Sequence, residues 1–529
     1  MVRGKNIDDG GAAHACKPVL RTEAGILLRV DTAQRVFSRA TPRAERSSIG
    51  QFLTPAPIAR FMASLFERSV AVARILDPGA GTGSLFVALT EELLSRPDRP
   101  KSIEIVAYET DRNIAPHLET TMELCRQLCT GMGVSFQGTV RYEDFISAAA
   151  PQLHDSLFGM TRDSFTHVIL NPPYKKINGE TPTHRILKSA GIETSNLYAA
   201  FVWLAAGLTR PGGEIVAITP RSFCNGPYFR RFRKTLLELI DLRHVHTFES
   251  RKEAFADDSV LQENVIFHGI RDEHCGRTVR ISVSRGRDFS ATQVREVPFH
   301  DVVAPDDSDA FIHLIEQDDG QQVMERMSRF RTTLAELGLE VSTGRVVDFR
   351  ARQFLRKDPE PGTAPLIYPC HFEEGFVRWP ITGAKKPNAI VASDQTENLL
   401  VPAGYYVLTK RFSAKEERRR IVGVIYNPTR METRLVGFEN HLNYFHSRGR
   451  GLSPDLARGL AVFLNSSVLD RYFRLFSGHT QVNATDLRKL RYPSGEQMLR
   501  LGREAETVLP DQQRIDSAVE KVCSQNGQT

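Results

Sequence analysis

Apolar and polar residues follow two different spacings in the N-terminal part of the chain. Short apolar runs rich in β-branched residues occur at VARIL, IEIVAYE, HVILNPP, GEIVAITP and NVIFHGI, and they have the composition of buried strands. Between them lie longer stretches of helical character, such as SLFVALTEELLSR and NLYAAFVWLAAGL. This alternation predicts a doubly wound, largely parallel α/β sheet with helices on both faces, in a domain over residues 47–300.

The pattern changes at the segment VAPDDSD, residues 303–309, which is typical of an interdomain linker. After it come short strand-like runs (PLIYP, YYVLT, RIVGVIY) and then helical stretches within SPDLARGLAVFLNSSVLDRYFRLF. We therefore expect a second, mixed α/β domain over residues 310–508. The two flanking segments lack such patterns, so we expect a flexible N-terminal arm over 1–46 and a polar C-terminal tail over 509–529.

The composition limits the class of protein. Apolar residues make up 41% of the chain and charged residues 25%, as in ordinary soluble globular proteins. The longest uncharged apolar run, near residues 201–208, is too short to span a bilayer, so no membrane association is expected. Seven cysteines without a CxxC pair favour a reducing cytoplasm and argue against structural zinc. Cys125 and Cys129 lie one helical turn apart and are expected to pack in the core.

The positive charge is concentrated in the C-terminal third. Residues 341–500 carry 25 Lys and Arg against 15 Asp and Glu, which gives this stretch a net charge of +10 and the remainder −4. Such an asymmetry favours a polyanionic partner, with a solvated basic surface as the alternative. The basic clusters occupy 349–357, 409–420 and 446–451.

Clustered Lys and Arg contact phosphates, and arginine also reads guanine edges. The candidates for such contacts are Arg350, Arg352, Arg448 and Arg450. Residues 415–420 are equally compatible with the solvated face of a helix that has i,i+4 ion pairs.

A glycine-rich turn separates the first strand from the first helix of the predicted sheet. The stretch RILDPGAGTGSL contains Asp77, Gly79, Gly81 and Gly83. Glycine permits positive φ and lets the backbone approach a ligand, and the helix start offers unpaired N–H groups. The spacing is neither GxGxxG nor a loop ending in Gly-Lys-Ser/Thr. The turn therefore predicts a nucleotide-like ligand without identifying it.

Acidic residues follow the next two strands. Glu109 ends AYETD at the carboxyl edge of the sheet, where a carboxylate can bind a ribose diol. Asp144 and Phe145 in RYEDF are suited to accept from an exocyclic amine and to cover an adenine face. Each residue alone has a simpler explanation: Asp77 as a turn residue, Glu109 as a surface charge, Asp144 as a helix cap. Their order on successive strands favours one shared site.

This order resembles that of the S-adenosylmethionine-dependent methyltransferases, and DPGAGTGSL is similar to their first motif. GQFLTPAPIARFMASLF upstream and NPPY at 171–174 resemble the TaqI-like γ-type DNA adenine-N6 methyltransferases of bacterial restriction–modification systems, whose longer relatives carry a C-terminal target-recognition domain. The resemblance implies S-adenosylmethionine as cofactor, double-stranded DNA as substrate and a separate cognate restriction endonuclease. It places at the cofactor site Thr54, Asp77, Gly79, Gly81, Gly83, Glu109, Asp144 and Phe145.

The stretch THVILNPPY ends a strand with an amide, two prolines and a tyrosine. The exocyclic nitrogen of adenine is a poor nucleophile because its lone pair is delocalised into the ring. The Asn171 side-chain oxygen and the Pro172 carbonyl would accept its two hydrogens and favour a pyramidal nitrogen, and Pro172 and Pro173 fix that geometry. Tyr174 would stack on a flipped-out base. Attack on a sulfonium methyl needs no metal and no strong base, because a positive charge is dispersed.

The family also uses a second stacking aromatic residue further along the chain. Phe255 in RKEAFADDSVLQENVIF is the candidate, although family members often have FP followed by basic residues where this chain has FADDS. Phe223 in TPRSFCNG competes for the role, with core packing as its simpler explanation.

Other functions share parts of these motifs. NPPY also occurs in methyltransferases of protein glutamine amides and of RNA guanine N2, which lack a long basic C-terminal domain. A non-catalytic DNA-recognition subunit with this fold is a further alternative, which the intact Asn171, Tyr174 and Asp77 disfavour. A fused nuclease is not indicated, because no convincing Asp…Glu-x-Lys constellation is present.

Overall fold

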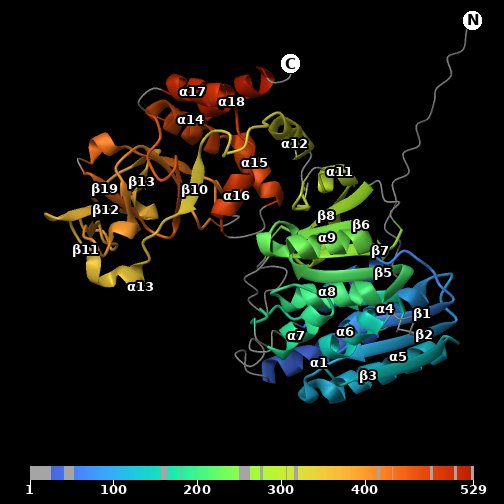
Figure 1. Ribbon diagram of the computed structural model, residues 1–529. Coiled ribbons are helices and arrows are strands. Elements are labelled where there is room, and N and C mark those ends of the chain that lie inside the picture. The colour runs from blue at the N-terminus through green and yellow to red at the C-terminus, as the bar shows by residue number, and fades with distance from the viewer. Residues whose placement is uncertain are drawn as a thin grey trace, which may run out of the picture.

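The computed structural model describes residues 25–40, 53–155, 164–179, 181–249, 263–273, 278–305, 307–314, 320–413, 417–431, 433–476, 481–505 and 509–525. Within these ranges an N-terminal α/β domain lies beside a C-terminal module, which we define as the elements from α12 to α18 (Figure 1).

The N-terminal domain is built on a nine-stranded sheet of order β3-β2-β1-β4-β5-β7-β6-β8-β9. The strands are β1 Val72–Pro78, β2 Ser102–Tyr108, β3 Ser135–Arg141, β4 Phe165–Leu170, β5 Thr209–Pro220, β6 Ile240–Phe248, β7 Asn264–Arg271, β8 Thr278–Arg285 and β9 Asp288–Pro298. The first five strands in this order, from β3 to β5, are parallel to one another. Strand β7 runs antiparallel to its two neighbours, β5 and β6, and the edge strand β9 runs antiparallel to β8. The α/β prediction is confirmed, and its parallel part is the half that carries the glycine turn.

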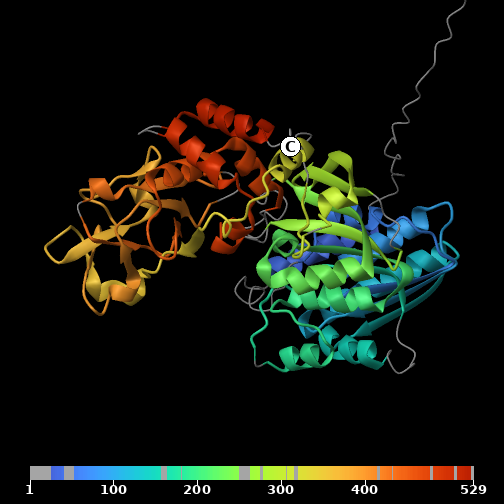
Figure 2. The same cartoon turned by 45° about the horizontal axis from the view of Figure 1, so that its top comes forward.

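Helices cover both faces of this sheet (Figures 1 and 2). Residues of α3 Ala56–Ser64, α4 Ser84–Ser95 and α5 Ala115–Gly131 form one apolar core with the sheet. Cys125 and Cys129 are buried in this core, as expected. The second core contains α6 Phe145–Asp155, α7 Pro182–Ser189, α8 Leu197–Leu208 and α9 Arg230–Leu239.

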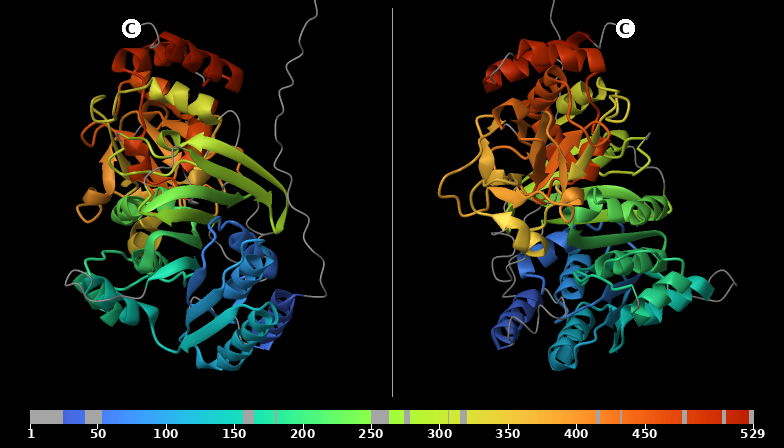
Figure 3. Two further views of the ribbon diagram at one scale, coloured as in Figure 1. Left: turned by 90° about the vertical axis from the view of Figure 1, so that its right-hand side faces the viewer. Right: turned by 60° about the vertical axis from the view of Figure 1, so that its left-hand side comes forward.

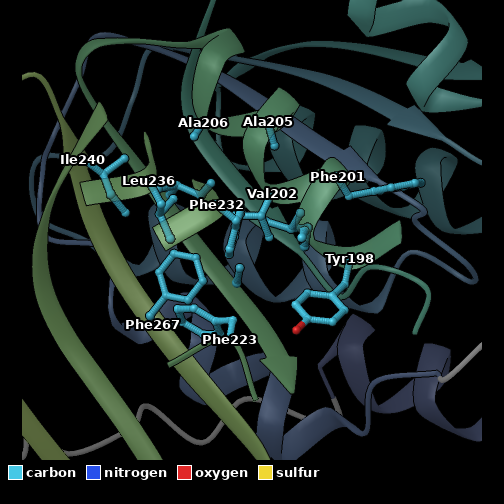
Figure 4. Packing of buried hydrophobic residues seen from close by; sticks show 14 of the residues in the cluster. Tyr198, Phe201, Val202, Ala205, Ala206, Phe223, Phe232, Leu236, Ile240 and Phe267 are labelled. Carbon is cyan, nitrogen blue, oxygen red and sulfur yellow. The ribbon is translucent and has the colours of Figure 1, made fainter. Parts of the chain in front are cut away.

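Helix α8 is apolar around its whole circumference because it is buried between the sheet and its neighbouring helices. Figure 4 shows Phe223, Phe232 and Phe267 gathered on one side of α8, whereas Phe201 points away from them. Phe223 is 3% exposed and packs against Phe232 and Phe267, so its core role is confirmed.

The expected flexible arm over 1–46 is wrong for its middle part. Helix α1, Ile26–Ala40, packs on the N-terminal domain, with Leu27 and Val30 fully buried or nearly so. Asp31 accepts a hydrogen bond from the Ala56 backbone N–H at 3.0 Å. The buried positions have helical spacing, so the segment gains enough contacts with the core to be ordered there.

The C-terminal module combines two small sheets with a group of helices. One sheet has the order β10-β20-β17-β18-β14-β13 and the other β11-β15-β12-β19-β16. The strands are β10 Glu340–Thr343, β11 Leu355–Arg356, β12 Thr363–Ile367, β13 Phe372–Glu373, β14 Phe376–Val377, β15 Ala389–Val391, β16 Leu400–Pro402, β17 Tyr406–Lys410, β18 Gly423–Tyr426, β19 Leu435–Phe438 and β20 Leu442–His446. The mixed α/β prediction for this region is confirmed.

The last helices of the module, in red, lie at the top of the molecule in Figure 3. They are α14 Pro454–Leu464, α15 Ser467–Phe476, α16 Ala484–Lys489, α17 Gly495–Glu504 and α18 Gln512–Gln525, with α12 Gly320–Ser328 packed on α15. The expected polar tail over 509–529 is wrong for α18. Its residues Ile515, Val519 and Val522 are buried at helical spacing in the module's core.

The module meets the N-terminal domain through α15 and α16. Lys489 pairs with Asp309 at 2.8 Å, and the Leu314 backbone N–H donates to the Leu475 carbonyl at 2.9 Å. Arg221 adds a hydrogen bond to the Arg474 carbonyl. These contacts bind the segment that leads out of the sheet to the helices of the module.

Candidate active site

The glycine turn forms the floor of a cavity at the carboxyl ends of β1, β2 and β4. Gly79, Gly81 and Gly83 all have positive φ, at +78°, +57° and +90°. A Cβ on Gly81 would lie 2.9 Å from a methyl group of Leu53, and the positive φ of Gly81 is one that other residues rarely adopt, so glycine is favoured there. Ser84 then begins α4, whose start faces the same space.

The cavity has a volume of about 190 Å³ and brings most of the predicted site residues together. Those that line it are Thr54, Gly79, Gly81, Glu109, Asp144, Phe145, Asn171 and Pro173. Four others do not line it, namely Asp77, Gly83, Pro172 and Tyr174. Phe255 lies outside the described residues.

The lining is acidic. Glu109, Asp111, Glu143 and Asp144 all border the cavity, and no Lys or Arg does so among the described residues. A site of this charge attracts cationic groups and disfavours the phosphates of ordinary nucleotides. Three aromatic rings supply its apolar surface: Phe145 lies 5.1 Å from Tyr108 and 5.2 Å from Phe201, measured between ring centroids.

Glu109 is 8% exposed, which rules out a role as a simple surface charge. Its carboxylate accepts from the backbone N–H groups of Gly81, Thr110 and Asp111 at 2.8–2.9 Å. Burial raises the pKa of this carboxyl, and these N–H groups act in the opposite direction. Glu109 therefore ties the second strand to the glycine turn as well as bordering the cavity.

Asp77 lies beneath the turn and is fully buried. Burial raises its pKa well above the ordinary value, while the Phe86 N–H lowers it and Glu109 raises it further. This position differs from the expected place in the cavity wall: Asp77 belongs to the end of β1 and does not line the cavity. Gly83 is the N-cap residue of α4, and a Cβ on it would lie 2.4 Å from the Phe86 ring.

Asp144 has two features at once. Its carboxylate accepts from the Ser147 backbone N–H at 3.0 Å and from the Ser147 hydroxyl at 2.6 Å, which is the geometry of a helix cap at the start of α6. It is also exposed at the rim of the cavity. The cap explanation and the site explanation are thus compatible.

The NPPY stretch follows β4 directly. The Asn171 amide nitrogen donates to the Thr54 hydroxyl at 3.0 Å, which connects it to the segment before the glycine turn. Tyr174 is half-buried; its hydroxyl donates to the Ile218 carbonyl at 3.3 Å, and its ring lies 6.2 Å from that of Tyr198. Burial raises the pKa of the Tyr174 phenol.

Gln34 of α1 is a cavity residue that the sequence patterns did not indicate. Its side chain donates to the Thr54 carbonyl at 3.1 Å and accepts from the hydroxyls of Thr82 and Ser84 at 2.9 and 2.8 Å. It thereby joins three separate segments that border the cavity. A polar residue at a buried helical position of α1 was the available signal, since Leu27, Val30 and Gln34 share one face.

The four arginines of the C-terminal module are exposed but lie in two places. Arg350 and Arg352 belong to α13, Asp348–Ala351, and η5, Arg352–Phe354. Arg448 and Arg450 lie in the turn after β20. Strand β10 runs antiparallel to β20, so that Thr343 pairs with Asn443 and Glu340 with His446. Arg350 and Arg352 follow the Thr343 end of β10, whereas Arg448 and Arg450 follow the His446 end of β20, so the two pairs lie at opposite ends of β20.

Arg420 does not fit either explanation given for 415–420. It is 2% exposed, its backbone N–H donates to Asp470 at 2.6 Å, and its guanidinium lies 5.6 Å from the Phe473 ring centroid. This arginine is part of the core, so it is neither a phosphate contact nor a residue on a solvated helix face.

The chain is similar to known methyltransferases over nearly its whole length. It is 42% identical to the type II methyltransferase M.PstI of Providencia stuartii, over 93% of this chain and 96% of that protein. It is 44% identical to the type II methyltransferase M.BsuBI of Bacillus subtilis, over 90% and 94%. The chain belongs to the type II methyltransferases of restriction–modification systems. The methyltransferase is therefore a DNA methyltransferase.

One further comparison agrees with this assignment, and another shows the same fold. The family model of the Eco57I restriction-modification methylase matches residues 113–255 of the methyltransferase. The structure of the type IIL restriction-modification enzyme MmeI in complex with DNA is similar in fold, with a TM-score of 0.52 at 12% identity over 94% of this chain and 72% of that one. No described helix of the methyltransferase is long and apolar enough to cross a membrane.

Proposed function

We propose that the methyltransferase transfers a methyl group from S-adenosylmethionine to N6 of a flipped-out adenine in double-stranded DNA. The observation that carries this proposal is the position of Asn171, which stands at the end of β4 in the wall of the cavity formed by the glycine turn. An amide at this place offers an acceptor to a planar amine, and no general base is needed beside it.

The lining of the cavity fits the cofactor. S-adenosylmethionine supplies, when bound, a methyl group activated by a positively charged sulfur. The acidic side chains favour a sulfonium and an ammonium over phosphates, and the rings of Tyr108, Phe145 and Phe201 offer apolar surface to an adenine. We assign the ribose diol to Glu109 and the exocyclic amine to Asp144, which are the acceptors on successive strands.

Asn171 and Pro172 would hold the target amine. The Asn171 amide nitrogen is committed to Thr54, so the amide presents its oxygen as the acceptor for one N–H of the target. The Pro172 carbonyl accepts the second N–H, and the two prolines keep it in place. With both hydrogens bonded, the lone pair of the nitrogen is directed out of the ring plane toward the methyl donor. Tyr174 stacks on the base.

We assign recognition of the DNA sequence to the C-terminal module. Its excess of positive charge suits a phosphate backbone, and Arg350, Arg352, Arg448 and Arg450 are exposed on it. A restriction endonuclease acting on the same site would be a separate protein, because methylation alone accounts for the motifs of this chain.

The decisive experiment identifies the methylated product. The protein is incubated with labelled S-adenosylmethionine and with DNA, RNA and protein separately, and each product is digested. We expect label in DNA N6-methyladenine. Label in RNA, in a glutamine side chain or in any other nucleoside would overturn the proposal. Long-read modification mapping of an expressing host then gives the recognition sequence.

A further inference from the structure

A second cavity, of about 450 Å³, opens in the C-terminal module. It lies where β17 and β20 meet the short helix η6, Pro369–His371. Its lining consists of Tyr368, Pro369, Cys370, Lys386, Lys410, Phe412, Glu439 and His441. None of these residues lines the cavity of the methyl-transfer site, which lies in the N-terminal domain.

His441 is held in a fixed orientation by Glu439. The imidazole Nδ1 lies 2.5 Å from Glu439 Oε1, and the His441 backbone N–H donates to Oε2 at 2.9 Å. Glu439 is 1% exposed, and both of its carboxylate oxygens accept from His441. The His441 side chain is 50% exposed, which leaves Nε2 as the nitrogen that faces outward.

The two lysines of the cavity differ in their partners. Lys386 pairs with Asp348 at 2.7 Å and lies 5.2 Å from the Tyr368 ring centroid. The Tyr368 hydroxyl donates to the other oxygen of the same carboxylate at 2.7 Å. Among the described residues no acidic group pairs with Lys410, which is half-buried in the cavity wall. Lys410 therefore offers three donors to a ligand.

The polar groups available to a ligand are donors. Both carboxylates near the cavity, Glu439 and Asp348, already accept from two groups each. Lys410 offers its ammonium donors, and His441 presents Nε2 on the side of the ring away from Glu439. In the major groove, guanine is the base that presents two adjacent acceptors, N7 and O6; adenine and cytosine each present a donor there. The cavity thus complements guanine.

An aromatic wall completes the site. Phe412 is 43% exposed although its ring centroid lies 5.0 Å from the His441 ring, at an interplanar angle of 45°. A base edge that reached the cavity would contact this exposed ring. Phe412 lies in the segment just after β17, where the Val482 backbone N–H donates to the Arg411 carbonyl at 2.7 Å, two residues before α16.

We propose that this cavity receives the major-groove edge of one guanine of the recognition sequence, with Lys410 as its principal donor and His441 as a second contact through Nε2. The inference rests on the assignment of DNA recognition to the C-terminal module. It makes Lys410 and His441 specificity-determining residues, in contrast to arginines that bind phosphates at any sequence.

The test couples a protein substitution to a base substitution. Duplexes carrying the mapped recognition sequence are prepared with 7-deazaguanine at one guanine at a time, which removes the N7 acceptor. We expect one such position to weaken binding of the wild-type protein at least about fivefold. The Lys410→Met variant should bind the unmodified duplex about as weakly as the wild type binds the modified one. Placing 7-deazaguanine at the same position should then weaken binding of this variant by less than a further factor of about two. If Lys410→Met and 7-deazaguanine weaken binding independently of each other at every guanine, the proposal is overturned.

Two controls separate the remaining outcomes. Lys385→Met changes an exposed lysine next to Lys386 and should show the full 7-deazaguanine effect. Methylphosphonate substitution of the DNA backbone tests the phosphates as alternative acceptors. Coupling of Lys410 to one phosphate and to no guanine would also contradict the proposal.

The double variant Arg350→Ala, Arg352→Ala separates the cavity from the rest of the module. If this variant weakens binding while Lys410→Met does not, the cavity assignment fails and the module's role stands. If neither weakens binding, recognition by the module fails as well.

The exposed Cys370 provides a readout that does not depend on affinity. It borders the cavity, and among the described cysteines it is exposed while Cys125, Cys129, Cys224 and Cys523 are buried. We expect DNA with the recognition sequence to slow alkylation of Cys370, measured by peptide mass spectrometry, more than DNA without it. Equal alkylation in both would contradict occupation of the cavity.

Discussion

Asn171 and Thr54 are separated by 117 positions in the sequence and joined by one hydrogen bond of 3.0 Å. Sequence patterns could place Asn171 at a strand end and Thr54 upstream of the glycine turn, but not their contact. The contact changes the role that we give to Thr54. We propose that Thr54 positions the amide, in addition to lining the cavity.

Replacement of Asn171 by alanine should abolish most methyl transfer while cofactor binding persists. Loss of one preorganised hydrogen-bonding group at a reacting centre typically costs 10²–10³-fold in kcat. Turnover is measured with labelled cofactor and DNA, and cofactor affinity by calorimetry. Asn178→Ala, an exposed asparagine of the same segment, is the matched control and should be normal. Near-normal turnover of Asn171→Ala would contradict the role of this amide.

Thr54→Val removes the acceptor for the Asn171 amide and keeps the shape of the side chain. Leaving a buried donor without its partner costs about 1–3 kcal/mol, and here we expect about a tenfold fall in kcat. The KM for the cofactor should change less than threefold. Thr54→Ser keeps the hydroxyl and should restore most of the activity. A serine variant as slow as the valine variant would show that the hydroxyl does not act through Asn171.

At the scale of elements, the glycine turn leaves little room for added side-chain atoms at Gly81 and Gly83. Gly81→Ala adds a methyl group at a φ of +57° and 2.9 Å from Leu53, so it combines a strain of about 1–2 kcal/mol with a contact in the cavity wall. We expect about a tenfold loss of cofactor affinity by calorimetry. Gly449→Ala is the control, because its φ is also positive, at +78°, and its Cβ would meet nothing within 4 Å. Equal affinity in both variants would contradict the predicted shape of the site.

Which elements the sequence could predict depends on their burial. Strands β1, β2, β4, β5 and β7 are apolar runs because they are central and covered on both faces. The edge strand β3, SFQGTVR, and the histidine-containing β6, IDLRHVHTF, have no such run and were not predicted. Helices α1 and α18 were taken for an arm and a tail because polar and charged residues are interspersed among their apolar positions, so neither contains a continuous apolar run.

Removal of α18 tests whether this segment is structural. Deletion of residues 512–529 removes the buried Ile515, Val519 and Val522, and the pair of hydrogen bonds between Ser467 and Asp516. Burial of such side chains stabilises by about 1.5–3 kcal/mol each, so the C-terminal module should lose stability and DNA binding. Cofactor binding should remain. Deletion of 526–529 alone should have no effect. A fully active 512–529 deletion would show that α18 is dispensable.

At the scale of the whole molecule, the nine-stranded sheet contains a buried row of histidines that the methyl-transfer site does not use. His246 lies between Ser282 and Ser284, at 2.7 and 3.0 Å, and His244 lies 2.6 Å from Ser282. Burial lowers the pKa of both imidazoles to about 3. Nearby Arg280, the other histidine and His268 lower that of His244 further. Both histidines are therefore neutral in the folded protein.

This arrangement makes the protein acid-labile. Well above pH 6.5, the ordinary pKa of histidine, both side chains are neutral in the folded protein and in the unfolded chain, so they do not make the free energy of unfolding depend on pH. Between about pH 6.5 and 3 the unfolded chain binds protons that the folded protein excludes, so the free energy of unfolding falls as the pH falls. At pH 5 the loss is about 2 kcal/mol per histidine. We expect the urea midpoint to drop accordingly between pH 7.5 and 5.

His246→Asn separates this effect from the titration of carboxylates, because asparagine does not titrate and its amide can still reach Ser282. The variant should lose less stability than the wild type between pH 7.5 and 5, by about 2 kcal/mol. His300→Asn changes a histidine whose side chain is 69% exposed and should follow the wild-type curve. Superimposable pH profiles for His246→Asn and the wild type would mean that His246 is charged in the folded protein. The sheet would then have to hold a buried cation beside two serine hydroxyls, which the cost of desolvating a charge makes unfavourable.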